Sequence, residues 1–423
     1  MSNIKNIKAY EILDSRGVPT LLTEIILENG IKGQAAVPSG ASTGIYEALE
    51  LRDKDKKRYL GKGVLNNVTL INSIILETLQ GQDVRNQKNI DNILLELDGT
   101  KNKSKLGANT ILSVSLAVAK TAALYEKVEL YKYLGGLNTN YLPIPLVNII
   151  NGGAHALNNL DIQEYMIAPV GAKSFKEAIR WCSEIFFNLK ELLKTNNLST
   201  AVGDEGGFAS NFKNNFEPLE YIVKAIKRAK LKPEKDVLLS LDVAASEFYK
   251  KNKYNLKANK KSLTSNQMVD FLSNIVSNYP IFSIEDGCSE DDWTGWTNLS
   301  TKINSKTLIV GDDLFVTNKE RLKKGIIKKA ANSILIKPNQ IGSLLETMQT
   351  INLAKANKIE TIISHRSGET EDNFIADLSV GTNSKIIKTG SVTRSERCSK
   401  YNRLLYIEKN NKNLEYAGNY FNE

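Results

Sequence analysis

The stretch LIVGDDLFVTNKERLKKGIIKKAANSILIK, residues 308–337, contains the pattern that decides the fold. Its first apolar run, residues 308–311, ends at Asp312, and its last run, residues 333–336, ends at Lys337. The separation of these two charged positions is the length of one strand, loop and helix. The stretch therefore predicts one unit of a parallel sheet that has helices on its outside.

The same pattern recurs through the second part of the chain. Apolar runs also end at Asp242, Glu285, His365 and Lys388, and successive endpoints from Glu285 onward lie 23 to 28 residues apart. Helical periods lie between the runs, as over residues 341–356. Roughly eight or nine such strand candidates predict an α/β fold that closes into a TIM-type (βα)8-like barrel. In such a barrel the charged strand ends meet at one mouth.

The first part of the chain has a different pattern. Residues 4–12 and 21–27 are β-rich, and residues 28–30, Glu-Asn-Gly, are a hairpin turn signal. Helical periods follow over residues 70–79, 90–97 and 111–124. Strands followed by helices predict a smaller α+β domain. The predicted organisation is an N-terminal α+β capping domain over residues 1–135 and a barrel domain over residues 136–423.

Composition and charge exclude several classes of protein. The chain has 423 residues, of which 41% are hydrophobic, so it can bury a large core. The net charge is +9, but the lysines are scattered in short groups and do not form the concentrated basic patch of a nucleic-acid binder. Three cysteines without close pairing fit a reducing compartment. With no apolar signal stretch and no run of about 18 apolar residues, the expected compartment is the cytoplasm, with no membrane span.

Three carboxylates, those of Asp242, Glu285 and Asp312, follow three different predicted strands. If they meet at one mouth, they repel one another unless a cation neutralises them. Hard carboxylate oxygens suit Mg²⁺ better than zinc or copper, which favour His and Cys. The pattern therefore predicts a magnesium site.

Basic side chains follow the neighbouring strands. Lys337, when partly desolvated and close to bound cations, has its neutral form favoured and can act as a base. Lys388, Arg366 and His365 add donors that suit an anionic ligand, most naturally one with a phosphate and a carboxylate. Both histidines of the chain, His155 and His365, fall in predicted mouth loops. Further polar candidates near predicted strand ends are Gln163, Glu164 and Glu205.

Ten segments of the chain resemble the enolase family, in the family's order. They are PSGASTG (38–44), NGGAH (151–155), DIQEYMI (161–167), VGDEGGF (202–208), LDVAASEFY (241–249), SIEDG (283–287), GDDLFVTN (311–318), ILIKPNQIGS (334–343), ISHRSGETED (363–372) and IKTGS (387–391). The resemblance runs from DSRG at 14–17 to SKYNRLL at 399–405, nearly the whole chain. It implies the enolase variant of the barrel and a hydro-lyase that interconverts 2-phosphoglycerate and phosphoenolpyruvate in glycolysis.

The resemblance also implies roles for individual residues. Two Mg²⁺ ions are expected in each active site, with Asp242, Glu285 and Asp312 as ligands of the tighter ion and Ser42 as a ligand of the second. Lys337 resembles the base that removes the C2 proton, and Glu205 the acid that assists departure of the C3 hydroxyl. Substrate contacts are expected from His155, Gln163, Glu164, His365, Arg366, Ser367 and Lys388.

Two other functions compete with this interpretation. A racemase or cycloisomerase of the same wider superfamily would act on a non-phosphorylated acid, but the Ser42 loop and Arg366 argue against it. A non-catalytic scaffold on the same fold, for example one attached to an RNA-processing complex, should have lost some of the proposed ligands, and the sequence keeps them all. The resemblance further implies a homodimer, or an octamer built from dimers, and the sequence does not choose between them.

Overall fold

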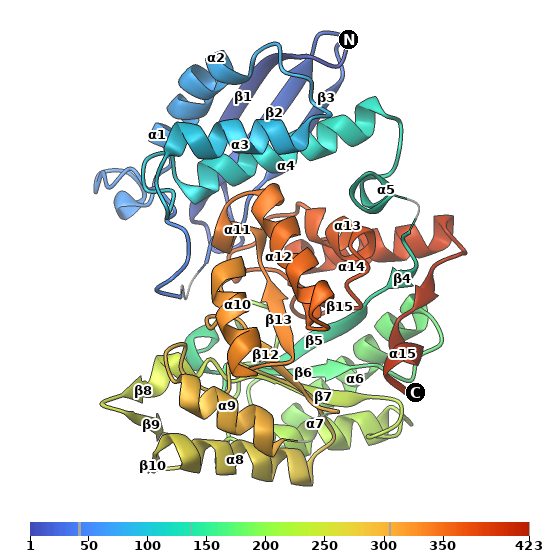
Figure 1. Cartoon of the computed structure of the whole chain (residues 1–423). Helices are drawn as coiled ribbons and strands as arrows, with labels where there is room; N and C mark the ends of the chain where they lie inside the picture. Colours follow the sequence, from blue (N-terminus) through green and yellow to red (C-terminus); the bar gives the residue numbers. More distant parts are fainter. Residues whose placement is uncertain (41–43, 137, 304–305, 423) are drawn as a thin grey trace.

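A computed structural model describes residues 1–40, 44–136, 138–303 and 306–422 of the chain. Ser42 therefore lies outside the described residues. Figure 1 shows a smaller N-terminal unit packed on the larger unit that contains the barrel. In the described part of the chain, helix α5 ends at Gly135 and strand β4 begins at Tyr141, so the predicted domain boundary falls in the connection between them.

The smaller unit is a three-stranded antiparallel sheet, in the order β1-β2-β3, covered by helices on one side (Figure 1). Its elements are β1 (Ile4–Leu13), β2 (Pro19–Leu27), β3 (Lys32–Ala36), η1 (Tyr59–Gly61), α1 (Leu65–Leu70), η2 (Ile71–Ile75), α2 (Leu76–Leu79), α3 (Gln87–Asp98), α4 (Ala108–Tyr125) and α5 (Leu130–Gly135). The turn predicted from Gly30 joins β2 to β3, which pair antiparallel. The expected α+β organisation is confirmed.

Helix α4 is the core helix of this unit. It packs on β2 and β3, and it is long and apolar enough to cross a bilayer by length and composition. However, 83% of its apolar window is buried inside the protein. A helix that is apolar on all sides is expected where it is surrounded by protein, so the burial explains its composition.

The larger unit is a closed barrel of eight strands, in the order β11-β12-β13-β14-β15-β5-β6-β7. Its strands are β5 (Ile144–Asn151), β6 (Glu164–Ala168), β7 (Leu238–Asp242), β11 (Ile281–Glu285), β12 (Leu308–Gly311), β13 (Ser333–Ile336), β14 (Glu360–Ser364) and β15 (Ile386–Lys388). The surrounding helices are α6 (Phe175–Thr195), α7 (Glu217–Arg228), α8 (Ser265–Asn278), α9 (Trp293–Lys302), α10 (Lys319–Lys328), α12 (Leu344–Ala356), α13 (Phe374–Gly381) and α14 (Ser395–Asn410). The predicted barrel is confirmed.

Shorter elements complete the larger unit. A small antiparallel sheet, in the order β10-β9-β8, follows β7 in the chain. The short elements are β4 (Tyr141–Leu142), η3 (Gly153–His155), η4 (Ala245–Phe248), β8 (Tyr249–Lys250), β9 (Lys253–Leu256), β10 (Lys261–Leu263), α11 (Pro338–Ile341), β16 (Glu415–Tyr416) and α15 (Gly418–Asn422). Strand β16 pairs with β4, so the end of the described chain returns to the start of the larger unit.

Strand β6 departs from the expected parallel sheet, because it pairs antiparallel with both β5 and β7. The connection from β5 to β6 contains only the short η3 and no crossover helix, so β6 returns beside β5 in the opposite direction. This reversal matters for the site. Glu164, the first residue of β6, lies opposite Asn151 and Asp242, the last residues of β5 and β7. A residue that opens its strand thus lies at the mouth formed by the carboxyl ends of the others.

Candidate active site

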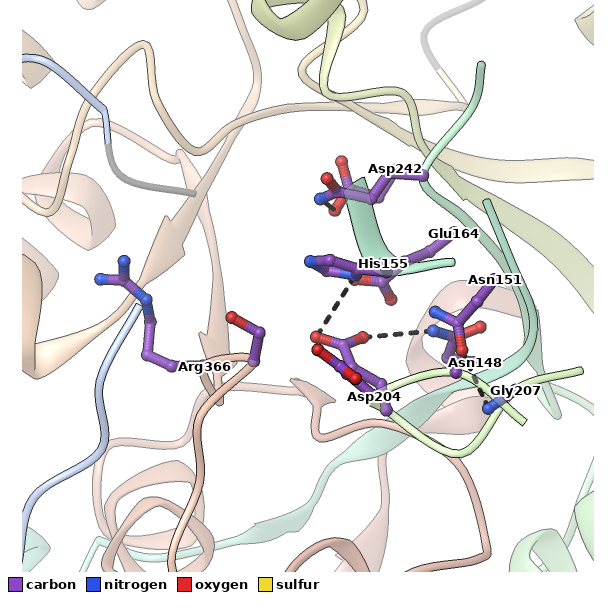
Figure 2. Close-up of polar contacts among 12 residues, drawn as sticks. Asn148, Asn151, His155, Glu164, Asp204, Gly207, Asp242 and Arg366 are labelled. Carbon is purple, nitrogen blue, oxygen red and sulfur yellow. Dashed lines mark hydrogen bonds and ion pairs between the residues drawn. The ribbon is translucent and has the colours of Figure 1, made fainter. Parts of the chain in front are cut away.

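One pocket at the carboxyl ends of the barrel strands gathers nearly all of the predicted site residues. Figure 2 shows His155 and Glu164 close together, with Arg366 on the other side of the same space. The predicted residues that line this pocket are His155, Gln163, Glu164, Glu205, Asp242, Asp312, Lys337, His365, Arg366, Ser367 and Lys388. Of the other two predicted residues, Glu285 lies behind the lining and contacts Lys388, and Ser42 is outside the described residues. The site residues therefore converge, although their roles stay predictions.

Lys388 is the centre of the most acidic part of the pocket. Its Nζ lies 2.8 Å from Asp242 Oδ2, 2.8 Å from Glu285 Oε1 and 3.2 Å from Glu164 Oε1. Burial works against the charged amine, but these carboxylates outweigh it and hold the pKa of Lys388 well above its ordinary value. The Gln163 amide donates to the same Asp242 oxygen at 3.2 Å. Lys388 is therefore a fixed positive charge at the mouth.

Lys337, at the end of β13, contacts a different acid. Its Nζ lies 2.5 Å from Asp312 Oδ2, while Gln340 Nε2 donates to Asp312 Oδ1 at 2.8 Å. Burial is the largest single effect and lowers the pKa of the amine, but the charges of Asp312 and Glu285 act in the opposite direction, and the net shift is upward. The expected preference of Lys337 for its neutral form is thus not produced by burial alone. It requires something that competes with the lysine for the Asp312 carboxylate.

Glu164 and Glu205 are two buried carboxyl groups that shift each other's pKa. Burial and the charge of Glu205 raise the pKa of Glu164 well above its ordinary value. For Glu205, burial is outweighed by His155, His365 and Arg397, which lower its pKa well below the ordinary value. The surroundings thus favour the protonated form of Glu164 and the ionised form of Glu205. The role of Glu205 as the acid stays a prediction.

Two histidines and an amide surround the Glu205 carboxylate. Its Oε1 atom lies 3.6 Å from His155 Nδ1 and 3.6 Å from His365 Nε2. Its Oε2 atom accepts a 3.2 Å hydrogen bond from Asn148 Nδ2. These groups favour the ionised form of Glu205. His155 Nδ1 also lies 3.6 Å from Glu164 Oε1, so this histidine faces both members of the pair.

Arg366 connects the barrel to the smaller unit. Its Nη1 donates to Glu47 Oε2 at 2.9 Å and to Asn339 Oδ1 at 3.1 Å, and its Nη2 donates to Glu47 Oε1 at 3.2 Å. The guanidinium thus grips a carboxylate with two nitrogens, the geometry that also suits a phosphate. The ion pair therefore holds Glu47, a residue of the smaller unit, at the barrel mouth.

The pocket has the donor set of a hard cation. Among the described residues, two separate groups could hold a metal ion: Asp286 with Asp312 and Asp313, and His155 with Glu164 and Glu205. Within each group, the potential ligand atoms lie within 4.8 Å of one another. The predicted triad is less compact, because the amine of Lys388 lies against Asp242 and Glu285 while Asp312 contacts Lys337. Nevertheless Asp242 and Asp312 both act, after burial, to raise the pKa of Glu285. Carboxylates forced together in this way fit Mg²⁺.

Several residues of the site were not predicted from the sequence. Asp286 is one of them: its carboxylate accepts the backbone N–H groups of Asp312 and Asp313, each at 2.9 Å. Its φ of 45° places it in the left-handed region, which is uncommon for a residue with a side chain. The sequence signal was present, since Asp286 follows Glu285 at a strand end. Glu47, Asn148 and Gln340 gave no signal, because they contact the site from elements whose position depends on the folded structure.

The fold and this pocket define a class of protein. A closed α/β barrel with buried acids and amines at the carboxyl ends of its strands is a barrel enzyme of the TIM type. Residues 4–134 match the family described as "Enolase, N-terminal domain", and residues 139–423 match "Enolase, C-terminal TIM barrel domain". The chain belongs to the enolase family. Membership supports lyase chemistry of the enolase type on a small molecule, with a general dependence on magnesium.

Proposed function

We propose that the protein catalyses the reversible dehydration of 2-phosphoglycerate to phosphoenolpyruvate. The observation that carries the proposal is that one pocket contains both the amine of Lys337 and the buried carboxyl groups of Glu164 and Glu205. A reaction that removes a proton from one carbon and a hydroxide from the next needs a base and an acid on the two sides of its substrate.

Lys337 is the proposed base for the C2 proton. An ordinary lysine, with a pKa of about 10.4, is almost fully protonated at neutral pH and cannot accept a proton. Positive charge bound at the Asp312 carboxylate would compete with the amine for that carboxylate and favour the neutral lysine. General base catalysis supplies a factor of roughly 10²–10⁴ in rate, so the remaining acceleration must come from groups that stabilise the developing negative charge.

Lys388 and the proposed metal ligands surround the position for the substrate carboxylate. Loss of the C2 proton places additional negative charge on that carboxylate, and Lys388 is a fixed positive charge held there by its acidic neighbours. The residues that would hold two Mg²⁺ ions are Asp242, Glu285 and Asp312 for one and Ser42 for the other. Bound magnesium would supply further positive charge where the carboxylate becomes more negative.

Glu164 and Glu205 are the proposed source of the proton for the leaving C3 hydroxyl. Hydroxide leaves poorly unless it is protonated, and the raised pKa of Glu164 favours a protonated carboxyl in a buried setting next to His155 and His365. Arg366, whose two terminal nitrogens bind the Glu47 carboxylate in this structure, is the proposed contact for the phosphate. Gln163 and Ser367 line the same pocket and complete the proposed substrate contacts.

The direct test is a magnesium-dependent assay of the purified protein with 2-phosphoglycerate, followed by the ultraviolet absorbance of phosphoenolpyruvate. We expect turnover that disappears when EDTA is added and returns with excess Mg²⁺. Lactate and mandelate, as non-phosphorylated 2-hydroxy acids, are the comparison substrates for the superfamily alternative. Turnover of either of these without turnover of 2-phosphoglycerate would contradict the proposal.

The proposed assembly is a homodimer, or an octamer built from dimers, in the cytoplasm, as the resemblance of the sequence implies. Light scattering coupled to size-exclusion chromatography distinguishes these assemblies by mass. A single chain at micromolar concentration would contradict the proposed assembly but would not affect the proposed reaction, because every described side chain named above comes from one chain.

A further inference from the structure

Arg397 is a fully buried guanidinium at the start of α14, and none of the proposed roles uses it. A buried charge must satisfy its donors within the protein. Its Nη1 donates to the Arg366 carbonyl at 2.6 Å, and its Nη2 donates to the Ser367 carbonyl at 2.6 Å and, more weakly, to the Asp204 carbonyl at 3.4 Å. One side chain therefore joins the loop after β14 to the loop that carries Glu205.

The same guanidinium contacts the ring of His365. Arg397 Nη1 lies 2.7 Å from His365 Nδ1. A guanidinium has N–H donors and no acceptor, so Nδ1 must present its lone pair. A neutral imidazole whose Nδ1 is an acceptor carries its proton on Nε2. That Nε2 atom lies 3.6 Å from Glu205 Oε1, so the ring directs an N–H at the carboxylate.

The surroundings favour the neutral ring. Burial lowers the pKa of His365 well below its ordinary value, and Arg397, Lys388 and Lys337 act in the same direction. Glu205 opposes the shift without reversing it. The open question for the neutral His365 ring is therefore which of its two nitrogens carries the proton. Arg397 contacts one of these nitrogens, Nδ1.

The aliphatic stem of Arg397 packs against Gly390, in the loop after β15. Gly390 has a φ of +78°, and a Cβ atom built there would lie 2.8 Å from Arg397 Cδ and 3.1 Å from its Cγ. The neighbouring hydroxyl of Tyr401 donates to the Gly390 carbonyl at 2.6 Å and fixes this turn. The position of the arginine stem is thus determined by packing as well as by hydrogen bonds.

We propose that Arg397 is a positioning residue that holds His365 as the neutral tautomer with its proton on Nε2, directed at Glu205. The ring then donates toward the carboxylate or toward the oxygen of a leaving group beside it. The opposite tautomer would present a lone pair there and would repel both. The catalytic consequence rests on the proposed function, whereas the tautomer itself does not.

The tautomer is measured directly by ¹⁵N NMR of the full-length protein with ¹⁵N-labelled histidine. The chain has only two histidines, and His155→Gln assigns the signals. We expect His365 to show a protonated Nε2 and an unprotonated Nδ1 throughout the neutral pH range. A protonated Nδ1, or a ring protonated on both nitrogens at neutral pH, would overturn the proposal whether or not any variant folds.

Arg397→Lys tests the consequence, because lysine keeps the charge but cannot reach the ring and both carbonyls with a planar fork. We expect a mixture of His365 tautomers and a fall in kcat of about 10–100-fold, the range typical when a partner that orients a metal-bound histidine is removed, with little change in KM. The matched control is Arg403→Lys, on the same helix but paired with Asp377 and Glu129 away from the pocket.

The readouts separate the two proposals. If Arg397→Lys keeps both the tautomer and kcat, Arg397 is only structural and the inference fails. If both variants lose kcat equally, the loss reflects destabilisation of α14, and the inference again fails. Absence of 2-phosphoglycerate turnover in the unchanged protein contradicts the proposed function, while the ¹⁵N spectrum still decides whether Arg397 sets the tautomer.

Discussion

The amine of Lys337 lies 2.5 Å from Oδ2 of Asp312, so the proposed base and a proposed metal ligand are in direct contact. Gln340 holds the other oxygen of this carboxylate at 2.8 Å, and the backbone N–H of Asp312 is bound by Asp286 at 2.9 Å. Asp312 is therefore held at both carboxylate oxygens and at its backbone N–H. The Asp312 carboxylate can bind either the Lys337 amine or a cation, so metal binding affects whether Lys337 is protonated.

Asp312→Asn should weaken magnesium binding at least tenfold, which is about 1.4 kcal/mol, because a neutral amide oxygen attracts a hard cation less than a carboxylate does. Isothermal titration of Mg²⁺ into the purified variant measures this directly. Asp270→Asn, an exposed acid on α8, is the control and should bind as the unchanged protein does. Equal affinity in the two variants would remove Asp312 from the proposed ligands.

Lys337→Ala should keep the fold and magnesium binding but lose exchange of the substrate C2 proton by a factor of roughly 10²–10⁴. The exchange is followed by ¹H NMR of 2-phosphoglycerate in D₂O. Lys323→Ala, an exposed lysine of α10 paired with Glu320, controls for the loss of a positive charge. Exchange at the ordinary rate in Lys337→Ala would show that another group removes the proton.

The strand-end residues were predictable from the sequence, because a charged residue that directly follows a short apolar strand of a barrel is expected at the mouth of that barrel. Asp242, Glu285 and Lys337 follow that rule. The direction of β6 was not predictable, because a short strand-like run such as residues 163–167 is compatible with either direction. Glu164 was still placed in the site by the resemblance, and the reversal of β6 supplies the physical reason for its position.

Contacts made across the fold were the part that the sequence did not predict. In the sequence, Arg397 stands among polar residues at the start of a helix and would be expected on the surface. In the structure it is fully buried beside His365. Glu47 reads as a loop acid, yet it pairs with Arg366 from the smaller unit. Pairings of this kind depend on how distant segments pack, and neither periodicity nor spacing along the chain specifies them.

The contact between the two units should depend on pH through Asp91 of α3. Its carboxylate accepts the N–H of Leu345 at 2.8 Å, at the start of α12. Burial raises its pKa to about 6, compared with about 3.9 in an unfolded chain. Between these values the folded protein binds more protons, so stability is fully present below about pH 4 and falls until about pH 6. At about 1.4 kcal/mol per pH unit, the total loss is about 3 kcal/mol.

Asp91→Asn removes this pH dependence while keeping an oxygen for the Leu345 N–H. Urea denaturation between pH 4 and 8 should therefore show the variant gaining stability relative to the unchanged protein up to about pH 6 and then a constant difference. Asp98→Asn is the control with the opposite sign. Its burial is outweighed by N–H donors, chiefly that of Leu106, which lower its pKa, so this variant should lose stability at neutral pH. If the difference in the free energy of unfolding between Asp91→Asn and the unchanged protein did not vary with pH, the pKa of Asp91 would not be raised by folding.

Arg366→Lys should lower kcat/KM for 2-phosphoglycerate by about 10²-fold, close to 3 kcal/mol and within the range for a disrupted buried charge pair. Lysine keeps the positive charge but cannot bind phosphate oxygens with two nitrogens. Steady-state kinetics with Arg180→Lys, a surface arginine of α6, as the control gives the comparison. An unchanged kcat/KM would place the phosphate elsewhere in the pocket.

Glu205→Gln should separate the two halves of the reaction. The variant keeps Lys337, so exchange of the C2 proton should continue, while the dehydration rate should fall by roughly 10²–10⁴ because the leaving hydroxyl loses its proton supply. Measuring ¹H exchange and phosphoenolpyruvate formation in the same sample gives the ratio of the two rates. Glu164→Gln should behave in the same way, since both carboxyl groups belong to the proposed proton supply and shift each other's pKa, whereas Lys337→Ala should lose both activities. If exchange and dehydration fell together in Glu205→Gln, this carboxylate would belong with the base, and the two sides of the pocket would not divide the chemistry as proposed.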